Sequence, residues 1–374
     1  MAKVKKVIKK MKGEMKTYYS YGNVYESTAE IFYPKTVVEL RELLLFCKEN
    51  NRKITVAGSF NSFDKQNSGN DVVISLQKFN SIKYNNSNHT ITVGSGVSWG
   101  TIFDVVYENK CALFTCITGV KPTAGGTLSV NSNSVWTPGN GKEGNHCLEI
   151  EVMTTEGQVL TCSRTENSDL FYGVVGGLGF LGFIIKITYQ VFYVGSHYEI
   201  KIDVVDYDDI NELEKRLPLR KSKQFNTLED LKSQSTLFYF DAKQPKFCVY
   251  NRTYKTVKKH KKSSKLASGL ATIASGVIRF YPALASLAVK KDTNKKSNKR
   301  LLIKNLTAPK YGLFWAQPDY NWSKQFSKFF QKLGYEPKLY QNSYFIPEGE
   351  EKVTLFTKKV YDLIEKKRIS LLYV

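Results

Sequence analysis

The spacing of apolar residues along the first 110 positions predicts a series of alternating strands and helices. Residues 31–33 form a short apolar block, and apolar residues then recur every three to four positions through Val37–Glu49. This spacing is typical of a helix with one buried face. Thr36 stands just before the helix and Glu39 follows three residues later, which predicts a capping box. Residues 53–57 form the next apolar run and are typical of a short buried strand.

The patterning continues to residue 194 and predicts an α/β region with a glycine-rich middle. Strands are expected at 72–75 and 90–93, a helix at 98–109, a β-hairpin of 148–154 and 158–162 with Gly157 in its turn, a short helix at 169–174 and a strand at 183–194. Between these elements, residues 119–144 are rich in Gly, Ser, Asn and Thr. That composition predicts a loop region with short ordered pieces.

The pattern of apolar and charged residues changes near Gly195, where we place a domain boundary. Beyond it, strand-like alternation recurs at 197–205, 237–240 and 247–250, with Lys-rich helices between. A chain of 374 residues is long enough for two domains. The expected division is a basic lead-in over 1–24, a first domain over 25–195 and a second domain over 196–374.

One apolar segment inside the second domain stands apart. Residues 266–289 are apolar and rich in small residues, interrupted by Arg279 and Pro282, and lysines flank them on both sides. A charge and a proline near the middle disfavour a membrane span, which needs about 20 uninterrupted apolar residues. For the whole insert, residues 262–292, two alternatives remain: two short helices on an anionic membrane surface, or a helical hairpin packed on the domain.

The composition is strongly basic, with 55 Lys and Arg against 34 Asp and Glu and a net charge of +21. Most lysines are scattered, which favours a solvated basic surface, and without a recognisable nucleic-acid-binding module no nucleic-acid partner is expected. Six cysteines without a C-x-x-C pair and four dispersed histidines give no metal-ligand spacing. No secretory segment follows Met1, so reduced cysteines and a cytoplasmic location, with or without peripheral membrane attachment, are expected.

The candidate chemistry begins in a turn after the strand at 53–57. Residues 56–64 (VAGSFNSFD) leave that strand and enter small and polar positions, whose backbone N–H groups can converge on an anion such as a pyrophosphate. Taken alone, such a sequence is more often an ordinary turn. A second glycine-rich loop follows at 119–127 (GVKPTAGGT), and a third glycine-rich run at 176–184 (GGLGFLGFI) leads into the last strand of the region.

In the order and spacing of these blocks, residues 30–195 resemble the FAD-binding domain of the vanillyl-alcohol-oxidase-like flavoproteins, also called the p-cresol-methylhydroxylase type. Decaprenylphosphoryl-ribose oxidase, aldonolactone oxidases and sterol Δ24-reductase are the members nearest in look. Gly144-Asn145-His146 is similar to the first of these, and residues 166–172 are similar to the last. The resemblance implies an α+β fold: an FAD-binding domain of two α/β subdomains, and an antiparallel α+β substrate cap. The cap is expected to be C-terminally truncated, since members usually continue beyond the position of Val374.

The resemblance also implies which residues hold FAD. The first turn would hold the pyrophosphate, the second loop would line the pyrophosphate and ribityl path, and the start of the last strand would meet the adenine side. Glycine suits such positions because the backbone must approach the cofactor closely. The residues concerned are Ala57, Gly58, Ser59, Phe60, Asn61, Ser62, Phe63, Gly119, Thr123, Gly125, Gly126, Thr127, Asn131, Gly144, Asn145, Gly182 and Ile184.

Two departures from the family pattern change the expected chemistry. Many members carry a histidine, covalently attached to the flavin, where this chain has Asn61. An amide cannot form that link, so non-covalent FAD is expected. The usual His-Gly pair after the second loop is replaced by Asn133 and Ser134, and Trp136 and Thr137 stand where the ribose oxidase has Lys- or His-type residues. These changes argue against assigning the sugar substrate of the ribose oxidase to this chain.

In the second domain the best local match is residues 340–347 (YQNSYFIP), where Gln341 and Ser343 would share one face of a strand. The resemblance suggests that this face meets the isoalloxazine ring, which makes the two residues the catalytic candidates; an outward-facing polar alternation is the alternative. The expected function is hydride transfer between FAD and a substrate C–OH group or C=C bond, the substrate being a small molecule such as a sugar, a lipid-linked sugar or a similar alcohol. A flavin-binding pseudoenzyme or membrane-associated scaffold is the other function considered.

Overall fold

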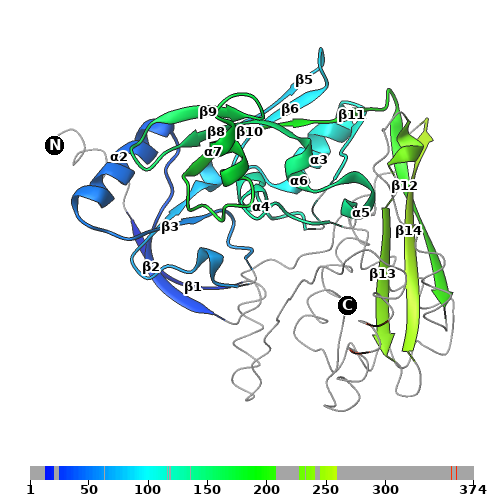
Figure 1. The fold of residues 1–374 in the computed structure, drawn as a ribbon, viewed down its shortest axis with the longest axis horizontal. Helices are drawn as coiled ribbons and strands as arrows, with labels where there is room; N and C mark the ends of the chain where they lie inside the picture. Colours follow the sequence, from blue (N-terminus) through cyan, green and yellow to red (C-terminus); the bar gives the residue numbers. More distant parts are fainter. Residues whose placement is uncertain are drawn as a thin grey trace. The chain divides into compact units, whose positions relative to one another are not determined.

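The structure, a computed structural model, describes residues 13–20, 25–62, 64–115, 117, 119–134, 136–207, 227–231, 233–240 and 245–258, and the single residues 355 and 359 (Figure 1). The chain divides into two compact units. Of the described residues, the first unit contains those through Ser134 and Gly141–His197. The second unit contains those of Val135–Asn140 and those from Tyr198 onward.

The first sheet of the first unit has four strands in the order β1-β2-β4-β3. They are β1 (Glu14–Tyr19), β2 (Glu26–Phe32), β3 (Ile54–Ala57) and β4 (Val72–Ser75). β2 and β3 run parallel to β4, and β1 is antiparallel to β2. Strands that run the same way need a crossover connection, and helix α2 (Val37–Glu49) supplies it between β2 and β3.

The second sheet has five antiparallel strands in the order β5-β6-β10-β8-β9. They are β5 (Ile82–Asn85), β6 (Thr90–Gly94), β8 (Cys147–Met153), β9 (Val159–Ser163) and β10 (Phe183–Gln190). β8 and β9 form the predicted hairpin, and Gly157 takes a φ of +81° in its turn. The two sheets give the mixed α+β fold that the sequence predicted.

Helix α2 spans the residues that the sequence predicted, and its start differs in one detail. The Thr36 hydroxyl accepts a hydrogen bond from the backbone N–H of Glu39 (3.1 Å), which is half of a capping box. The Glu39 carboxylate accepts from the backbone N–H of Lys35 (2.6 Å) instead of that of Thr36. The reciprocal half of the box is therefore displaced by one residue.

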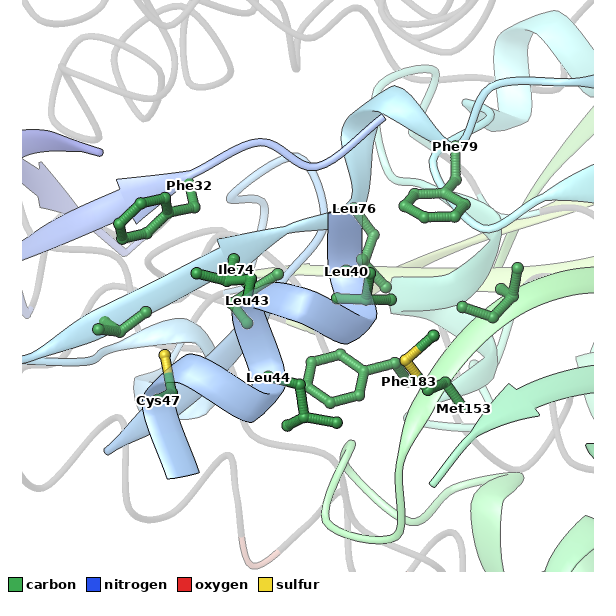
Figure 2. Close-up of a cluster of buried hydrophobic side chains, with 12 residues drawn as sticks. Phe32, Leu40, Leu43, Leu44, Cys47, Ile74, Leu76, Phe79, Met153 and Phe183 are labelled. Carbon is green, nitrogen blue, oxygen red and sulfur yellow. The ribbon is translucent and has the colours of Figure 1, made fainter. Parts of the chain in front are cut away.

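The buried face of α2 joins the two sheets of the first unit. Leu43 and Leu44 of α2 lie in one apolar cluster with Ile74 of β4 and with Met153 and Phe183 of the second sheet (Figure 2). Burying a leucine of this kind contributes about 1.5–3 kcal/mol relative to leaving it exposed. We call this set the core cluster; its buried members are Phe32, Leu40, Leu43, Leu44, Cys47, Val72, Ile74, Leu76, Phe79, Met153, Phe183 and Ile185.

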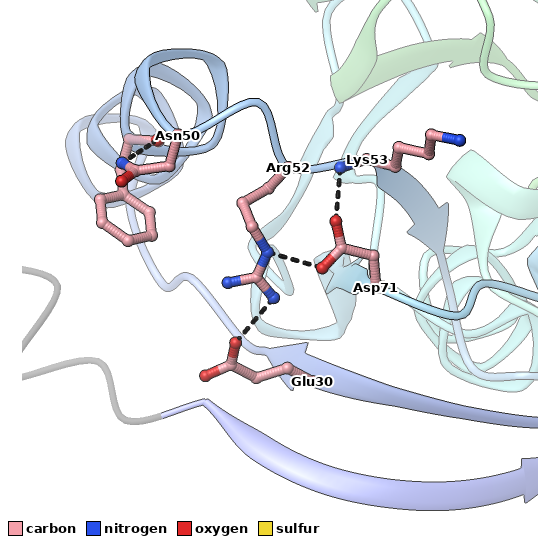
Figure 3. A network of polar contacts seen from close by, with 6 residues as sticks. Glu30, Asn50, Arg52, Lys53 and Asp71 are labelled. Carbon is pink, nitrogen blue, oxygen red and sulfur yellow. Dashed lines mark hydrogen bonds and ion pairs between the residues drawn. The ribbon is translucent and has the colours of Figure 1, made fainter.

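A polar network ties three strands of the first sheet together at one end. Arg52 Nε donates to Asp71 Oδ1 (2.6 Å), and Arg52 Nη2 donates to Glu30 Oε2 (3.1 Å) (Figure 3). The backbone N–H of Lys53 donates to Asp71 Oδ2 (2.6 Å). These residues lie in β2 or directly before β3 and β4, so the network fixes the relative position of the three strands.

Short helices and strands occupy the connections. These are α3 (Trp99–Glu108), β7 (Cys111–Ala112), α4 (Ala124–Leu128), α6 (Glu143–His146), α7 (Ser168–Val174) and β11 (Phe192–Tyr193), with the 3-10 turns η1 (Lys65–Asn67) and η2 (Leu76–Lys78). Two of them, α4 and α6, are short ordered pieces of the kind predicted for the glycine-rich middle. The strand predicted for 183–194 is wrong at its end. β10 stops at Gln190, and Phe192 and Tyr193 leave it to pair with Ala112 and Cys111 of β7.

The second unit, in its described part, has a sheet of three strands in the order β12-β14-β13. They are β12 (His197–Tyr207), β13 (Ser233–Phe240) and β14 (Pro245–Val257), accompanied by η3 (Leu228–Asp230) and α5 (Thr137–Asn140). Each strand contains the shorter one that the sequence predicted. Trp136 and Tyr198 both pack on Tyr254, with ring centroids 5.1 Å apart in each pair. Trp136 is therefore part of an aromatic core in this unit.

No helix among the described residues is long and apolar enough to cross a membrane. The apolar insert at 262–292 lies outside the described residues, and so do the C-terminal candidates Gln341 and Ser343.

Candidate functional site

The first glycine loop follows β3 and is fixed by hydrogen bonds from the end of the neighbouring strand, β4. Ala57, the last residue of β3, is buried. The carbonyl oxygen of Gly58 accepts hydrogen bonds from Ser75 Oγ (3.1 Å) and Gln77 Nε2 (3.0 Å). Two side chains from the end of β4 and the turn after it thus fix where this loop begins.

The structure brings the first glycine loop against the second. Ser59 Oγ donates to the carbonyl oxygen of Lys121 (2.8 Å). A Cβ atom on Gly58 would lie 2.3 Å from Thr123 Oγ1. Because no other residue lacks a Cβ atom, only glycine allows the two loops to approach this closely. The two loops that the resemblance assigns to the pyrophosphate therefore meet, although Ser59 and Lys121 are 62 residues apart in the chain.

Asn61, at the position of the family's histidine, is turned toward its own loop. Its Nδ2 donates to the carbonyl oxygen of Ser59 (2.9 Å) and to Ser59 Oγ (2.6 Å). Phe60 has a positive φ of 56° and packs edge-on against Tyr18 at a centroid distance of 5.0 Å. Ser62 is partly buried, and Phe63 lies outside the described residues.

The second loop continues into α4, which packs against the turn that follows β6. The backbone N–H of Gly125 donates to the carbonyl oxygen of Ser95 (2.8 Å), and that of Ala124 donates to Val97 (2.9 Å). Gly119 is buried and Gly126 is exposed. The hydroxyl oxygens of Ser95 and Thr123 are buried and have no hydrogen-bond partner in the described part of the chain.

These two hydroxyls and the loop junction fit an oxygen-rich anionic ligand. Buried polar groups in proteins are nearly always hydrogen-bonded, so a buried hydroxyl without a partner indicates a ligand or a water molecule. The residues present therefore suit the diphosphate part of FAD.

Asn131 and Gly144 also lie together. The backbone N–H of Gly144 donates to Asn131 Oδ1 (3.0 Å), and the backbone N–H of Gly176 donates to Leu128 (3.0 Å) at the end of α4. Asn145 is exposed. The α4 end, the α6 start and the loop after α7 thus meet at one place, next to the second glycine loop.

Gly182 and Ile184 lie at the start of β10. A Cβ atom on Gly182 would lie 2.6 Å from the carbonyl oxygen of Met153 in β8, so a side chain cannot be accommodated there. Ile184 is buried and faces Val152 of β8 across the ladder. Gly179 in the same loop approaches Val56 of β3, which places this loop beside the strand that carries the first glycine loop.

Sequence reasoning missed a buried carboxyl group behind the second loop. Glu143, the first residue of α6, is fully buried, and its Oε1 accepts hydrogen bonds from Thr127 Oγ1 (3.0 Å) and Tyr189 OH (2.5 Å). Thr127 Oγ1 accepts in turn from Trp99 Nε1 (2.8 Å). Thr127 therefore faces this interior network. Nothing in the sequence pattern marks Glu143, because its partners are 16 and 46 residues away.

Sequence reasoning also missed Arg164, which holds α6 at its other end. Its guanidinium donates to the carbonyl oxygens of Cys147 (2.8 Å), Gly144 (3.0 Å) and Asn145 (3.0 Å). Lone carbonyl groups at a helix end need such donors. Gly144 and Asn145 are thus fixed by a side chain from the turn after β9.

Among the described residues, no group of three or more His, Cys, Asp or Glu residues is placed to hold a metal ion. Cys47, Cys111, Cys147 and Cys162 are buried free thiols.

Comparison with known proteins agrees with this geometry. Residues 28–163 match the family described as "FAD binding domain". Over 192 residues the chain is 26% identical to an uncharacterized oxidoreductase from the fasciation locus of Rhodococcoides fascians. That alignment covers 51% of this chain and 43% of the relative. The chain is 27% identical over 172 residues to cytokinin dehydrogenase 2 of Arabidopsis thaliana, covering 45% of this chain and 34% of that enzyme. The chain thus spans less than half the length of either relative.

A solved structure supports the fold. Wild-type BBE-like 1 of Physcomitrella patens superimposes with a TM-score of 0.52 at 18% sequence identity, covering 67% of this chain and 56% of that one. The matched family, the order of the elements and the meeting of the two glycine loops lead to one conclusion. Residues 28–163 form an FAD-binding domain, and this part of the chain is similar to that of the vanillyl-alcohol-oxidase-like, p-cresol-methylhydroxylase-type flavoproteins.

Proposed function

We propose that this chain is an FAD-dependent oxidoreductase that binds FAD without a covalent link and exchanges a hydride with a C–OH or C=C substrate. The observation that carries the proposal is the junction of the two glycine loops, where Gly58 lies against Thr123 and two buried hydroxyls have no partner among the described residues. The names of the relatives, an oxidoreductase and a dehydrogenase, support redox chemistry.

Binding is assigned to the loops themselves. Backbone N–H groups of Gly58–Ser62 and the hydroxyls of Ser95 and Thr123 would hold the diphosphate, and Gly125 and Gly126 would leave room for the chain that follows it. Asn131, Gly144 and Asn145 would lie along the same path. When bound, FAD supplies the redox step by accepting or returning a hydride, and the protein orients it and excludes competing reactions.

The non-covalent link rests on Asn61. Its amide nitrogen is occupied by two hydrogen bonds within the first loop. An amide has no nucleophilic ring nitrogen that could be joined to a flavin carbon. The local structure therefore supports a first glycine loop that binds FAD by hydrogen bonds, without a covalent bond.

The proposal is tested by anaerobic reduction of the flavin-loaded protein. We expect at least one compound from a panel of primary and secondary alcohols, aldonolactones, lipid-linked sugars and a cytokinin to bleach the visible flavin bands. Reduction by none of these, nor by NADH or NADPH, would contradict an oxidoreductase. That result would favour the pseudoenzyme or scaffold alternative, which keeps the cofactor and lacks the reaction.

A further inference from the structure

A single buried carboxyl group connects four elements behind the second glycine loop. Glu143 of α6 accepts from Thr127 of α4 and from Tyr189 of β10, and Thr127 accepts from Trp99 of α3. All four side chains are buried. α4 has only five residues, and its inner face is held by this network together with the backbone contacts to Ser95 and Val97.

The surroundings of Glu143 favour an uncharged acid. No cation pairs with it in the described part of the chain, and its second oxygen, Oε2, is buried without a hydrogen-bond partner there. Arg164, which reaches the other end of α6, donates to three backbone carbonyls instead. The other titratable groups facing it are the Tyr189 hydroxyl and the Cys147 thiol.

Burial has the larger effect on the charge of this group. It raises the pKa of the Glu143 carboxyl to about 8, and the hydrogen bonds from Tyr189 and Thr127 lower that pKa by less. Burial also raises the pKa of Tyr189, and Glu143 raises it further. Because Tyr189 and Thr127 both donate to Oε1, the proton of an uncharged Glu143 carboxyl would lie on Oε2.

Loss of the Glu143 proton would put an unpaired charge into this interior. A buried carboxylate without a cation or further donors is strongly unfavourable, and water must enter to solvate it. The elements that would have to move are α4 and α6, because each is short and the hydrogen bond from Thr127 to Glu143 joins them. α4 carries Gly125 and Gly126, which belong to the proposed FAD site.

We propose that Glu143, in its uncharged form, is a positioning residue for FAD, which holds the second glycine loop from its inner side so that loss of its proton weakens FAD binding. This inference rests on the proposed FAD site. It adds a dependence of FAD affinity on pH, and that dependence comes from the Glu143 carboxyl.

The test is the dissociation constant of FAD for the full-length apoprotein, measured by flavin fluorescence between pH 6.5 and 9. If only the protonated form binds, and the carboxyl titrates at about 8, binding is about tenfold weaker at pH 9 than at pH 7, since apparent affinity scales with the competent fraction. Glu143→Gln has no proton to lose and keeps the acceptor oxygen, so its dissociation constant should be flat over this range. Glu156→Gln, in the exposed turn between β8 and β9, is the matched control and should keep the tenfold change.

A second readout does not depend on FAD. Hydrogen exchange of the backbone amides in α4 and α6 should speed up between pH 7 and 9 in the wild type beyond the intrinsic rise, and should not do so in Glu143→Gln. A wild-type dissociation constant that is unchanged from pH 7 to 9 would overturn the inference even if the variant fails to fold. Equal pH dependence in wild type and Glu143→Gln would overturn it as well. If the wild type takes up no FAD at any pH, the proposed function fails, and hydrogen exchange then decides the role of Glu143.

Discussion

At the scale of single residues, the closest approach in the site is that of Gly58 to Thr123. A Cβ atom added to Gly58 would meet Thr123 Oγ1 at 2.3 Å, whereas the Cβ and Cγ2 atoms of Thr123 would lie at 3.5 and 3.8 Å. Of the Thr123 atoms, only the hydroxyl oxygen would therefore clash with a Cβ atom on Gly58. One atom on one side chain decides whether the two glycine loops can tolerate a methyl group.

We expect Gly58→Ala to destabilise the protein by about 1–3 kcal/mol, the usual effect of overpacking a tight contact. Adding Thr123→Ala removes the hydroxyl and should restore most of that loss. The free energy of unfolding in urea, measured for both single variants and for the double variant, checks this. A double variant no more stable than Gly58→Ala would show that the contact is not the cause.

Residue-scale features were predicted unevenly. The first and second glycine loops could be named as candidates because their composition and order resemble a family pattern; their binding of FAD stays a prediction. Glu143 could not be, because a lone glutamate in a stretch rich in Gly and Asn gives no sign that it is buried. Its burial depends on Thr127 and Tyr189, which only the folded chain brings near.

At the scale of elements, α2 is the part that joins the two sheets of the first unit. Leu43 is completely buried in the core cluster, and Val38 on the opposite side of the helix is 56% exposed. The apolar spacing of this helix is the signal that allowed its bounds to be predicted. The same spacing now indicates which substitutions should matter.

Leu43→Ala should lower the free energy of unfolding by about 2–5 kcal/mol, because it removes buried methyl groups and leaves a cavity. Val38→Ala is the matched control and should change stability by less than about 0.5 kcal/mol. Chemical denaturation with a spectroscopic readout measures both. Similar losses for the two variants would contradict the packing described for α2.

The polar network between β2, β3 and β4 predicts a dependence of stability on pH. The backbone N–H of Lys53, followed by Arg52, lowers the pKa of the Asp71 carboxyl below its ordinary value of 3.8. Since the native state binds this proton less readily than the unfolded state, the network stabilises the fold above that value and the contribution is lost as pH falls through the lowered pKa.

Asp71→Asn should therefore be less stable than the wild type at pH 7, and the difference should shrink as the pH is lowered below about 4. Urea denaturation at pH 7, 5 and 3.5 gives the comparison. A difference that stays constant across this range would mean that the Asp71 charge does not contribute.

Elements with a clear apolar period were predicted, whereas those defined by pairing were not. β1 is mostly polar and lay unrecognised within the basic lead-in; its identity as a strand comes from its antiparallel pairing with β2. The end of β10 was placed four residues too late because the apolar run continues through residue 194. The chain leaves the sheet at Val191, whose backbone N–H donates to His89 (3.1 Å).

At the scale of the whole molecule, the match to the FAD binding domain covers residues 28–163, which lie mostly in the first unit. The predicted boundaries at 25–195 and 196–374, the substrate and the catalytic candidates Gln341 and Ser343 remain predictions. Residues outside the described set include the apolar insert at 262–292, whose role on a membrane surface is a proposal based on sequence alone.

For that insert, we expect the full-length protein to co-sediment with vesicles containing phosphatidylserine, and removal of residues 262–292 to reduce this binding. Each basic residue near an anionic surface contributes about 1 kcal/mol, so the flanking lysines matter as much as the apolar run. Neutral vesicles serve as the control. Undiminished co-sedimentation of the shortened protein would favour the helical hairpin packed on the domain.

The central claim is that this chain holds FAD by non-covalent contacts at the junction of its two glycine loops. Its most direct test is the visible absorption spectrum of the purified protein, recorded before and after acid precipitation. We predict flavin absorption bands in the native protein and release of the colour into the supernatant, because Asn61 cannot form a covalent link. Colour that stays in the pellet would contradict the assignment of Asn61, and a colourless protein that also takes up no added FAD would contradict the site itself.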